Sequence, residues 1–218
     1  MQGLEGDTDM ARAFAEVAFT PGVRAAQEEN GSAAAYGKFL LPEAERGDRL
    51  GESEAAFIAA RDGFYQASVS ETGWPYVQFR GGPAGFLKVL DDKTIAYADF
   101  RGNRQYISAG NLRSNDRVSL ILMDYPNRSR LKIWGRAKLI DKAGDPQALS
   151  RLHDRDYRAH PERAVMVSVE AFDWNCPQHI PERLTVQEFE PLIAPLRDEI
   201  SRLSAENASL KSRLAQSA

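Results

Sequence analysis

Cationic side chains gather where a predicted strand runs into a predicted helix. The segment TIAYADFRGNRQYISAGN places Arg101, Asn103 and Arg104 in a glycine-containing turn, and the residues from Arg104 to Leu112 are predicted to be helical. The first turn of a helix has unpaired backbone N–H groups, and arginine donates paired hydrogen bonds to phosphate oxygens. This arrangement favours an anion site. The alternative is that the arginines are solvated charges in a loop.

Two further predicted strands carry polar side chains on one face. Gln78 and Arg80 alternate with apolar residues and lead into a Gly-Gly pair, where a ligand can approach the backbone closely. Arg130 and Lys132 alternate in the same way along RLKIWG. These side chains indicate a polar site at a barrel edge or at the seam of a dimer, and a solvent-exposed strand face is the alternative.

Other chemistries find no support in the residue types. No basic residue adjoins Cys176, so nothing marks it as a nucleophile. The three histidines, His153, His160 and His179, are not spaced as a metal site, and no carboxylate pair is placed for hydrolysis. We therefore expect no metal and nominate no catalytic residue.

Composition narrows the class of protein. The 218 residues are 43% hydrophobic, which is enough for one core of roughly 150 residues with appendages. The net charge of -3 provides no basic surface for nucleic acid, and no apolar run approaches the ~20 residues of a membrane span. The N-terminal MQGLEGDTDM does not read as a secretory signal, and one cysteine fits a reducing compartment. We expect a soluble cytoplasmic protein.

The elements that position the polar residues are short strands. Turn signals separate segments rich in β-branched and aromatic residues, which indicates an antiparallel barrel or sandwich. The connection from Gly102 to Asn115 is too long for a hairpin and contains the short helix. The segments are FYQASVS, WPYVQFR, GFLKVL, TIAYADF, RVSLILMD and RLKIWGRAKLI, with RAVMVSVEAF as a last strand.

Helices are predicted on both sides of the strands. Thr20 caps a helix that starts with Pro21, and Ser53 caps another over residues 54–61. A helix over residues 145–157 precedes the last strand. We divide the chain into an N-terminal helical extension (1–61), a barrel (62–184) and a C-terminal helix (185–218).

The C-terminal helix has a heptad pattern. Asn207 falls at an a position, where a buried amide commonly fixes a two-stranded parallel register, and Glu206 and Lys211 fall at g and e positions. A coiled coil is one interpretation, and an amphipathic helix lying on its own barrel is the other. The residues in the repeat are Ile193, Leu196, Ile200, Leu203, Asn207, Leu210 and Leu214.

From about Asp62 to Asp173 the sequence resembles the FMN-binding split barrels related to pyridoxamine 5'-phosphate oxidase. The resemblance rests on YVQFRGG, on YADFRGNRQYISAGN followed by RVSLIL, and on RLKIWGRAKLI. It implies a mainly β (α+β) fold: an antiparallel six-stranded split β-barrel with peripheral helices and a C-terminal helix. It also implies a homodimer that binds FMN at the subunit interface.

The resemblance implies roles for several residues. Asn103 and Arg104 match the turn that holds the cofactor phosphate, and Arg80 matches a residue that contacts substrate phosphate in the vitamin-processing oxidases. Arg130 matches a residue that reaches the flavin from the second subunit. The candidate cofactor-binding residues are Gln78, Phe79, Arg80, Tyr97, Ala98, Asp99, Arg101, Asn103, Arg104, Gln105, Arg130, Lys132, Trp174, Asn175 and Gln178.

The loop FDWNCPQHIPER follows the last strand and supplies the final three candidates. Trp174 is placed to stack beside a flavin, and Asn175 or Gln178 to hydrogen-bond its edge. The alternative is a loop that plugs the core and buries Trp174 and Cys176.

Departures from the family pattern bear on the substrate. Asn103 stands where the family has a basic phosphate ligand, with Arg101 as a possible replacement. The hairpin between Arg80 and Thr94 is longer than in the vitamin-processing enzymes. Their RLHDR signature occurs here at residues 151–155, before the last strand, and we interpret it as coincidental. Pyridoxamine phosphate is therefore not the preferred substrate.

These observations predict an FMN-dependent oxidoreductase acting on a small molecule. The alternatives are a non-enzymatic flavin-binding or redox-sensing protein, a split-barrel protein that uses heme or a deazaflavin, and an interaction module whose C-terminal helix matters most.

Overall fold

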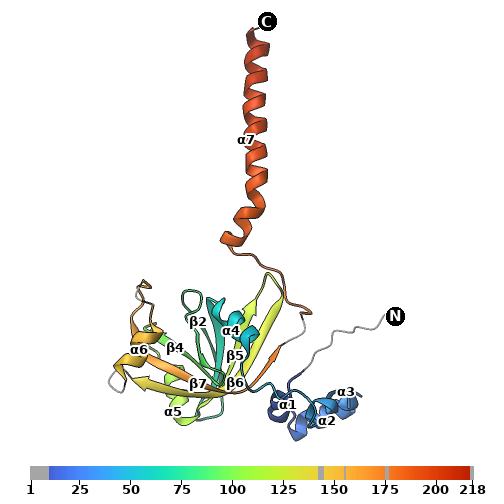
Figure 1. The fold of residues 1–218 in the computed structure, drawn as a ribbon, viewed down its shortest axis with the longest axis vertical. Coiled ribbons are helices and arrows are strands. Elements are labelled where there is room, and N and C mark those ends of the chain that lie inside the picture. Colours follow the sequence, from blue (N-terminus) through green and yellow to red (C-terminus); the bar gives the residue numbers. More distant parts are fainter. Residues whose placement is uncertain (1–9, 142–144, 155, 175–176, 217–218) are drawn as a thin grey trace. The chain divides into compact units, whose positions relative to one another are not determined.

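The computed structural model describes residues 10–141, 145–154, 156–174 and 177–216. They form two compact units (Figure 1). The first unit contains the described residues up to Asp124 and from Arg128 to His179. The second contains Tyr125–Asn127 and the residues from Ile180 onward.

The first unit is built on one antiparallel sheet with the order β2-β1-β5-β6-β7-β4-β3. This confirms the mainly β, antiparallel fold. The described residues contain seven strands, one for each segment that the sequence indicated, so the count of six strands in the barrel was one too low; the short β3 pairs with β4 at one edge. The strands are β1 (Gly63–Val69), β2 (Pro75–Gly81), β3 (Lys88–Asp91), β4 (Thr94–Phe100), β5 (Arg117–Asp124), β6 (Ser129–Asp141) and β7 (Pro161–Trp174).

The sheet curls until its first and sixth strands face each other. In the described part of the chain the two edge strands, β2 and β3, are not paired with each other. The side chain of Arg80 on β2 nevertheless reaches Asp99 on β4, with 2.6 Å between Nη1 and Oδ1. The sheet is therefore a barrel that stays open along one seam, which is the split barrel that the resemblance implied.

Alternation along the strands creates the core inside the curl. In β5, Val118, Leu120 and Leu122 point inward and are buried, as the period of two in a strand requires. They pack in one cluster with Phe64 and Ile133. The core therefore sits between the two halves of the sheet and leaves the polar residues of β2 and β4 at its rim.

The helices of this unit differ in how far they pack on the sheet (Figure 1). Phe14 of α1 stacks on Trp134 of β6 with 4.5 Å between ring centroids, whereas α2 and α3 bury no residue. The division of the chain into an N-terminal extension (1–61), a barrel (62–184) and a C-terminal helix (185–218) stays a prediction. The helices of this unit are α1 (Arg12–Ala18), α2 (Pro21–Glu29), α3 (Ala33–Gly37), η1 (Lys38–Leu40), α4 (Glu52–Ala59), α5 (Ile107–Ser114) and α6 (Pro146–Leu152).

Helix ends follow the predicted caps in part. The hydroxyl of Thr20 accepts a hydrogen bond from the Val23 N–H, and Pro21 is the first residue of α2, as predicted. The expected cap by Ser53 is wrong, because α4 starts at Glu52 with Gly51 as its N-cap. The short helix α5 starts at Ile107 rather than at Arg104, and α6 ends at Leu152 rather than at residue 157.

The second unit is dominated by α7 (Val186–Gln216), none of whose residues is buried. Pro191 and Pro195 lie inside it. No helix in the described part of the chain combines the length and the hydropathy that a bilayer span needs.

Candidate functional site

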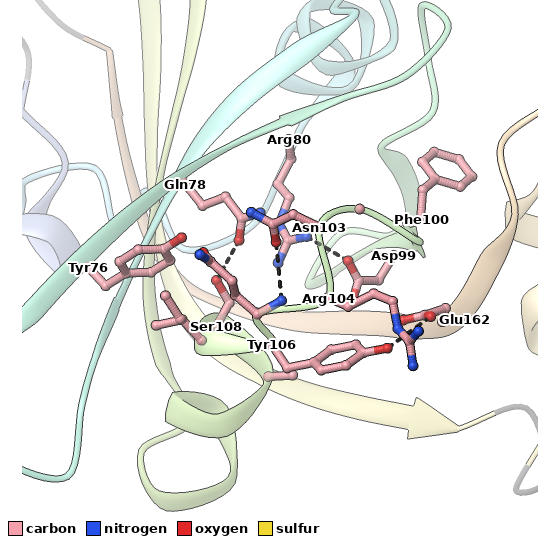
Figure 2. A pocket seen from close by; sticks show the side chains of 14 residues that line it. Tyr76, Gln78, Arg80, Asp99, Phe100, Asn103, Arg104, Tyr106, Ser108 and Glu162 are labelled. Carbon is pink, nitrogen blue, oxygen red and sulfur yellow. Dashed lines mark hydrogen bonds and ion pairs between the residues drawn. The ribbon is translucent and has the colours of Figure 1, made fainter.

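A pocket lies between β2, β4, the turn after β4 and the start of α5 (Figure 2). It gathers several of the candidates from separate parts of the chain, and β7 contributes Glu162. The candidate residues that line it are Gln78, Arg80, Asp99, Asn103, Arg104 and Gln105.

One face of β2 supplies a wall of the pocket. Tyr76, Gln78 and Arg80 share this face because alternate residues of a strand point the same way. Phe79 therefore points to the opposite face, where it is 57% exposed and its ring packs against Tyr65. The structure does not bring the Phe79 side chain to the pocket.

The N-terminus of α5 opens into the pocket. Tyr106 occupies the N-cap position, and no side chain caps the helix there. The first three helical residues, Ile107, Ser108 and Ala109, line the pocket, and their N–H groups precede the first intrahelical bond, from Gly110 N–H to the Tyr106 carbonyl. A helix start that lines a pocket in this way attracts an anion through its N–H groups and its partial positive charge.

The turn before α5 is held in an unusual backbone conformation. Arg104 and Tyr106 have φ values of 63° and 54°, which cost non-glycine residues about 1–2 kcal/mol each. The Asn103 side-chain oxygen accepts a hydrogen bond from the Gln105 N–H at 3.2 Å, and Ser108 Oγ donates to Gln78 Oε1 at 2.9 Å. These contacts tie the turn and helix to β2, so the strain is maintained by the surrounding structure.

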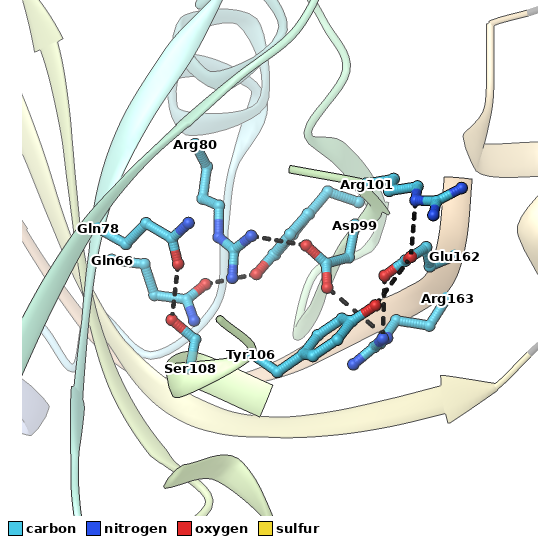
Figure 3. Close-up of polar contacts among 10 residues, drawn as sticks. Gln66, Gln78, Arg80, Asp99, Arg101, Tyr106, Ser108, Glu162 and Arg163 are labelled. Carbon is cyan, nitrogen blue, oxygen red and sulfur yellow. Dashed lines mark hydrogen bonds and ion pairs between the residues drawn. The ribbon is translucent and has the colours of Figure 1, made fainter. Parts of the chain in front are cut away.

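The carboxylates at the pocket are matched by arginines (Figure 3). Asp99 accepts from Arg80 at 2.6 Å and lies 3.7 Å from Arg163. Glu162 lies 3.2 Å from Arg163 and 3.9 Å from Arg101, and it accepts a hydrogen bond from the Tyr106 hydroxyl at 3.1 Å. An anionic ligand would therefore not meet an uncompensated carboxylate.

Arg104 is a second cation in the lining of the pocket, besides Arg80. Its side chain is exposed, and its contact with the Tyr106 hydroxyl, followed by the nearby charge of Glu162, raises the pKa of Arg104 above its ordinary value. The guanidinium is therefore charged at every working pH. Arg101 has a different position, because it lies against Glu162 and outside the lining of the pocket.

Tyr97 and Ala98 lie behind the pocket rather than in its wall. Tyr97 is buried, which raises the pKa of its phenol, and its hydroxyl donates to Gln66 Oε1 at 2.6 Å. The Arg80 guanidinium lies 5.8 Å from the centroid of the Tyr97 ring. Ala98 faces the other way and is buried with Leu149. The buried Tyr97 ring therefore packs against the Arg80 guanidinium on the side away from the pocket.

The candidates on β6 and at the end of β7 do not line the pocket. Lys132 lies 4.0 Å from Asp173, and burial lowers the pKa of Lys132 and raises that of Asp173. Trp174 donates from Nε1 to Glu54 Oε1 at 2.8 Å, and this hydrogen bond joins the end of β7 to α4. Arg130 also lies outside the pocket.

The loop after β7 is described only in part. Gln178 is exposed and does not line the pocket, and Asn175 and Cys176 lie outside the described residues. In the part of the chain that the structure covers, no three His, Cys, Asp or Glu side chains are grouped to hold a metal ion.

Several lining residues were not among the candidates. Tyr76 shares the two-residue spacing of Gln78 and Arg80 and could have been found from it, and Ser108 is the second residue of α5. Glu162 has no local signal, since it comes from β7 and meets the turn only in the folded barrel.

Comparison with known proteins gives a family match over the strands. Residues 50–174 match the family model described as pyridoxamine 5'-phosphate oxidase. No curated protein matches the chain.

Solved structures with a similar fold have low sequence identity to this chain. HupZ from Group A Streptococcus is 16% identical, with a TM-score of 0.44 over 62% of this chain and 99% of that one. A Clostridium acetobutylicum protein related to general stress protein 26, of the pyridoxinephosphate oxidase family, is 13% identical, with a TM-score of 0.42 over 62% and 94%. An FMN-binding protein from Syntrophomonas wolfei is 12% identical, with a TM-score of 0.41 over 55% and 81%.

Proposed function

The chain belongs to the pyridoxamine 5'-phosphate oxidase family, and we propose that it binds flavin mononucleotide in the pocket between β2, β4 and α5. The observation that carries this proposal is the uncapped N-terminus of α5, which opens into the pocket beside Arg104. Three backbone N–H groups at the helix start, with Arg104 in the lining of the same pocket, form a donor set suited to a phosphate.

The other lining residues fit the rest of the cofactor. The Ser108 hydroxyl donates a hydrogen bond to the oxygen of the Gln78 amide. The NH2 group of Gln78 therefore remains as a donor to the edge of the flavin ring. Asp99 and Glu162 are each paired with an arginine, so neither opposes a dianionic ligand with a bare charge.

The proposed activity is oxidation and reduction of a small organic molecule. Bound flavin would supply the chemistry by accepting a hydride or electrons and passing them on, and the protein would supply placement and electrostatics. Tyr76 and Tyr106 offer flat surfaces at the pocket, where a substrate could lie beside the ring.

We further propose a homodimer formed through the outer face of β2, β1 and β5. Phe79 lies opposite Tyr65 and Tyr65 lies opposite Ile121 in the strand register, so the three side chains form a row across the sheet. All three are exposed, as is Val77, and an apolar patch of this kind fits a second copy.

The same face would give a role to the two candidates on β6, Arg130 and Lys132, which lie outside the pocket of their own chain. Lys132 lies opposite Ile121 and continues the row onto β6, and Arg130 shares its face. A partner that packs on this face would be within reach of these two cations. We propose that they complete a neighbouring flavin site from the second subunit.

Flavin binding tests the proposal directly. The purified chain should show flavin absorbance, sediment as a dimer, and bind FMN at least about tenfold more tightly than riboflavin, since riboflavin lacks the phosphate. Turnover with reduced nicotinamide would favour an oxidoreductase, and a bound flavin without turnover would favour a carrier or sensor. Equal affinity for the two ligands would contradict the phosphate site, and tighter binding of heme or a deazaflavin would replace FMN as the cofactor.

A further inference from the structure

The helix α7 has a long apolar stripe that no other described residue of its unit covers. Leu196, Ile200, Leu203, Leu210 and Leu214 are each between 48% and 71% exposed. They alternate in steps of four and three along the helix, with Asn207 filling the remaining place. Side chains at these steps fall on one face, so the stripe runs along the whole second half of α7.

The residue types in the stripe favour a particular kind of pairing. If Asn207 is an a position, Ile200 and Leu214 are also a positions, and Leu196, Leu203 and Leu210 are d positions. An isoleucine at a combined with leucine at d favours two parallel strands over higher oligomers. Pro191 and Pro195 each remove one backbone hydrogen bond from the first part of α7. We therefore count the stripe from Leu196, the first residue after Pro195.

Asn207 adds a requirement for orientation. In a parallel pair in register, Asn207 meets Asn207 of the other helix, and the two amides can hydrogen-bond to each other. In an antiparallel pair, an a residue faces a d residue, which here is always leucine. An amide buried against leucine would lose its hydrogen bonds to water without gaining new ones, which is unfavourable.

One pair of charged residues beside the stripe suits a parallel arrangement. Glu206 is at a g position and Lys211 is at the e position five residues later, so a parallel pair brings the two opposite charges together across the interface. An antiparallel pair with the stripes fully overlapped would bring g positions together, which sets Glu206 against Glu206 of the other helix and Glu199 against Arg213. Within one chain Glu206 lies 3.1 Å from Arg202, which retains Glu199 at 2.7 Å if Glu206 turns to a partner.

We propose that α7 pairs in parallel and in register with α7 of a second copy of this chain, as a two-stranded coiled coil. The paired part, from Leu196 to Leu214, spans about 28 Å and is short for a coiled coil. Association of the barrels would hold two copies of the helix at a high effective concentration and so offset this short length. The pairing does not involve the flavin pocket.

Disulfide trapping tests the pairing in the full-length chain. In a Cys176→Ser background, Leu210→Cys places the chain's one thiol at a d position, and Ser209→Cys places it one residue away on the outer face. After mild oxidation at micromolar protein concentration, we expect a covalent dimer for Leu210→Cys and at least about tenfold less for Ser209→Cys, because only core positions bring the two Cβ atoms within disulfide range.

Each result of the trapping experiment decides the proposal. Equal crosslinking of the two variants would mean that the helices collide without a defined interface, and no crosslinking would mean that the stripe has another occupant. A Leu210→Cys chain that crosslinks to an Ile200→Cys chain in preference to itself would indicate an antiparallel pair. Circular dichroism of each variant before oxidation shows whether α7 is still helical, so a folding defect is recognised separately. Flavin absorbance should be the same in all variants, which separates this test from that of the flavin site.

Discussion

The Arg80 guanidinium lies 2.6 Å from the Asp99 carboxylate and joins strands that occupy the first and sixth places in the sheet (Figure 3). Asp99 is also 3.7 Å from Arg163, so one carboxylate serves two arginines. The side chains of Arg80 and Asp99 are only 14% and 11% exposed. This largely buried ion pair therefore bridges the open seam of the barrel beside the pocket, where no backbone hydrogen bonds join the two edge strands of the described sheet.

This sharing predicts an asymmetry between the two substitutions. Asp99→Asn leaves Arg80 and Arg163 without their common carboxylate, and we expect it to lower the free energy of unfolding by about 3–5 kcal/mol. Arg80→Met leaves Asp99 with Arg163 and should cost less, about 1–3 kcal/mol. Urea unfolding of the flavin-free protein measures both.

An exposed pair provides the control for this prediction. Arg136 contacts Asp116 and Glu170 at a well-solvated surface, so Arg136→Met should have little effect on unfolding. If Arg80→Met costs as much as Asp99→Asn, Arg163 does not take over the carboxylate, and the sharing inferred from the distances is wrong.

Arg104 should determine the preference for a phosphorylated flavin. We expect Arg104→Ala to weaken FMN binding by at least about tenfold and to leave riboflavin binding nearly unchanged, because riboflavin lacks the phosphate. Arg113→Ala is the matched control, since Arg113 is exposed in the last turn of α5 and changes the net charge equally. Fluorescence titration of both variants with both ligands gives the four affinities, and an equal loss for FMN and riboflavin would remove the phosphate assignment.

Glu54 should make the protein sensitive to acid. Burial raises the pKa of Glu54, but hydrogen bonds from Trp174, the Gly51 N–H and Ser53 together outweigh burial and place the pKa below its ordinary value of 4.5. A group whose pKa is lower in the folded state stabilises the protein above its unfolded pKa, and this contribution disappears as the pH falls through the folded pKa. We therefore expect part of the unfolding free energy to be lost below about pH 4.5.

Glu54→Gln tests this acid sensitivity. The amide keeps one acceptor oxygen for three donors, so we expect a loss of about 1–3 kcal/mol at pH 7 and a flatter decline of stability in acid. Glu52→Gln in the same first turn is the control, because Glu52 is exposed. Thermal unfolding between pH 3 and pH 7 compares the two, and the same pH profile for both variants would contradict the prediction.

Gly135 is required by the close approach of β6 and β7. A Cβ at this position would lie 2.4 Å from the Ser168 carbonyl oxygen and 2.8 Å from Val167 Cγ1, beside the register shift between the strands. We expect Gly135→Ala to destabilise the protein by about 2 kcal/mol or more. Gly110→Ala in α5 meets no atom within 4 Å and should be neutral or stabilising, which calorimetry of the two variants can show.

The sequence alone indicated the features that depend on neighbours along the chain. The strands could be predicted from their alternation, and Thr20 with Pro21 marked a helix start, because these signals act over a few residues. The turn with Asn103 and Arg104 was recognisable for the same reason, since a strand, a glycine-containing turn and a helix follow one another directly. The spacing of Gln78 and Arg80 placed them on one face of β2.

Only the tertiary structure decided which of these residues meet. Tyr97 and Asp99 are two residues apart in β4, so their side chains share one face of the strand. Tyr97 is nevertheless buried against Arg80, whereas Asp99 lines the pocket. Glu162 joins the pocket from a strand that is distant in the chain. Local patterns set which residues share a face, but the curl of the whole sheet sets which faces turn inward and which strands approach across the seam. That curl arises from burying the core between the two halves of the sheet, so no single segment determines it.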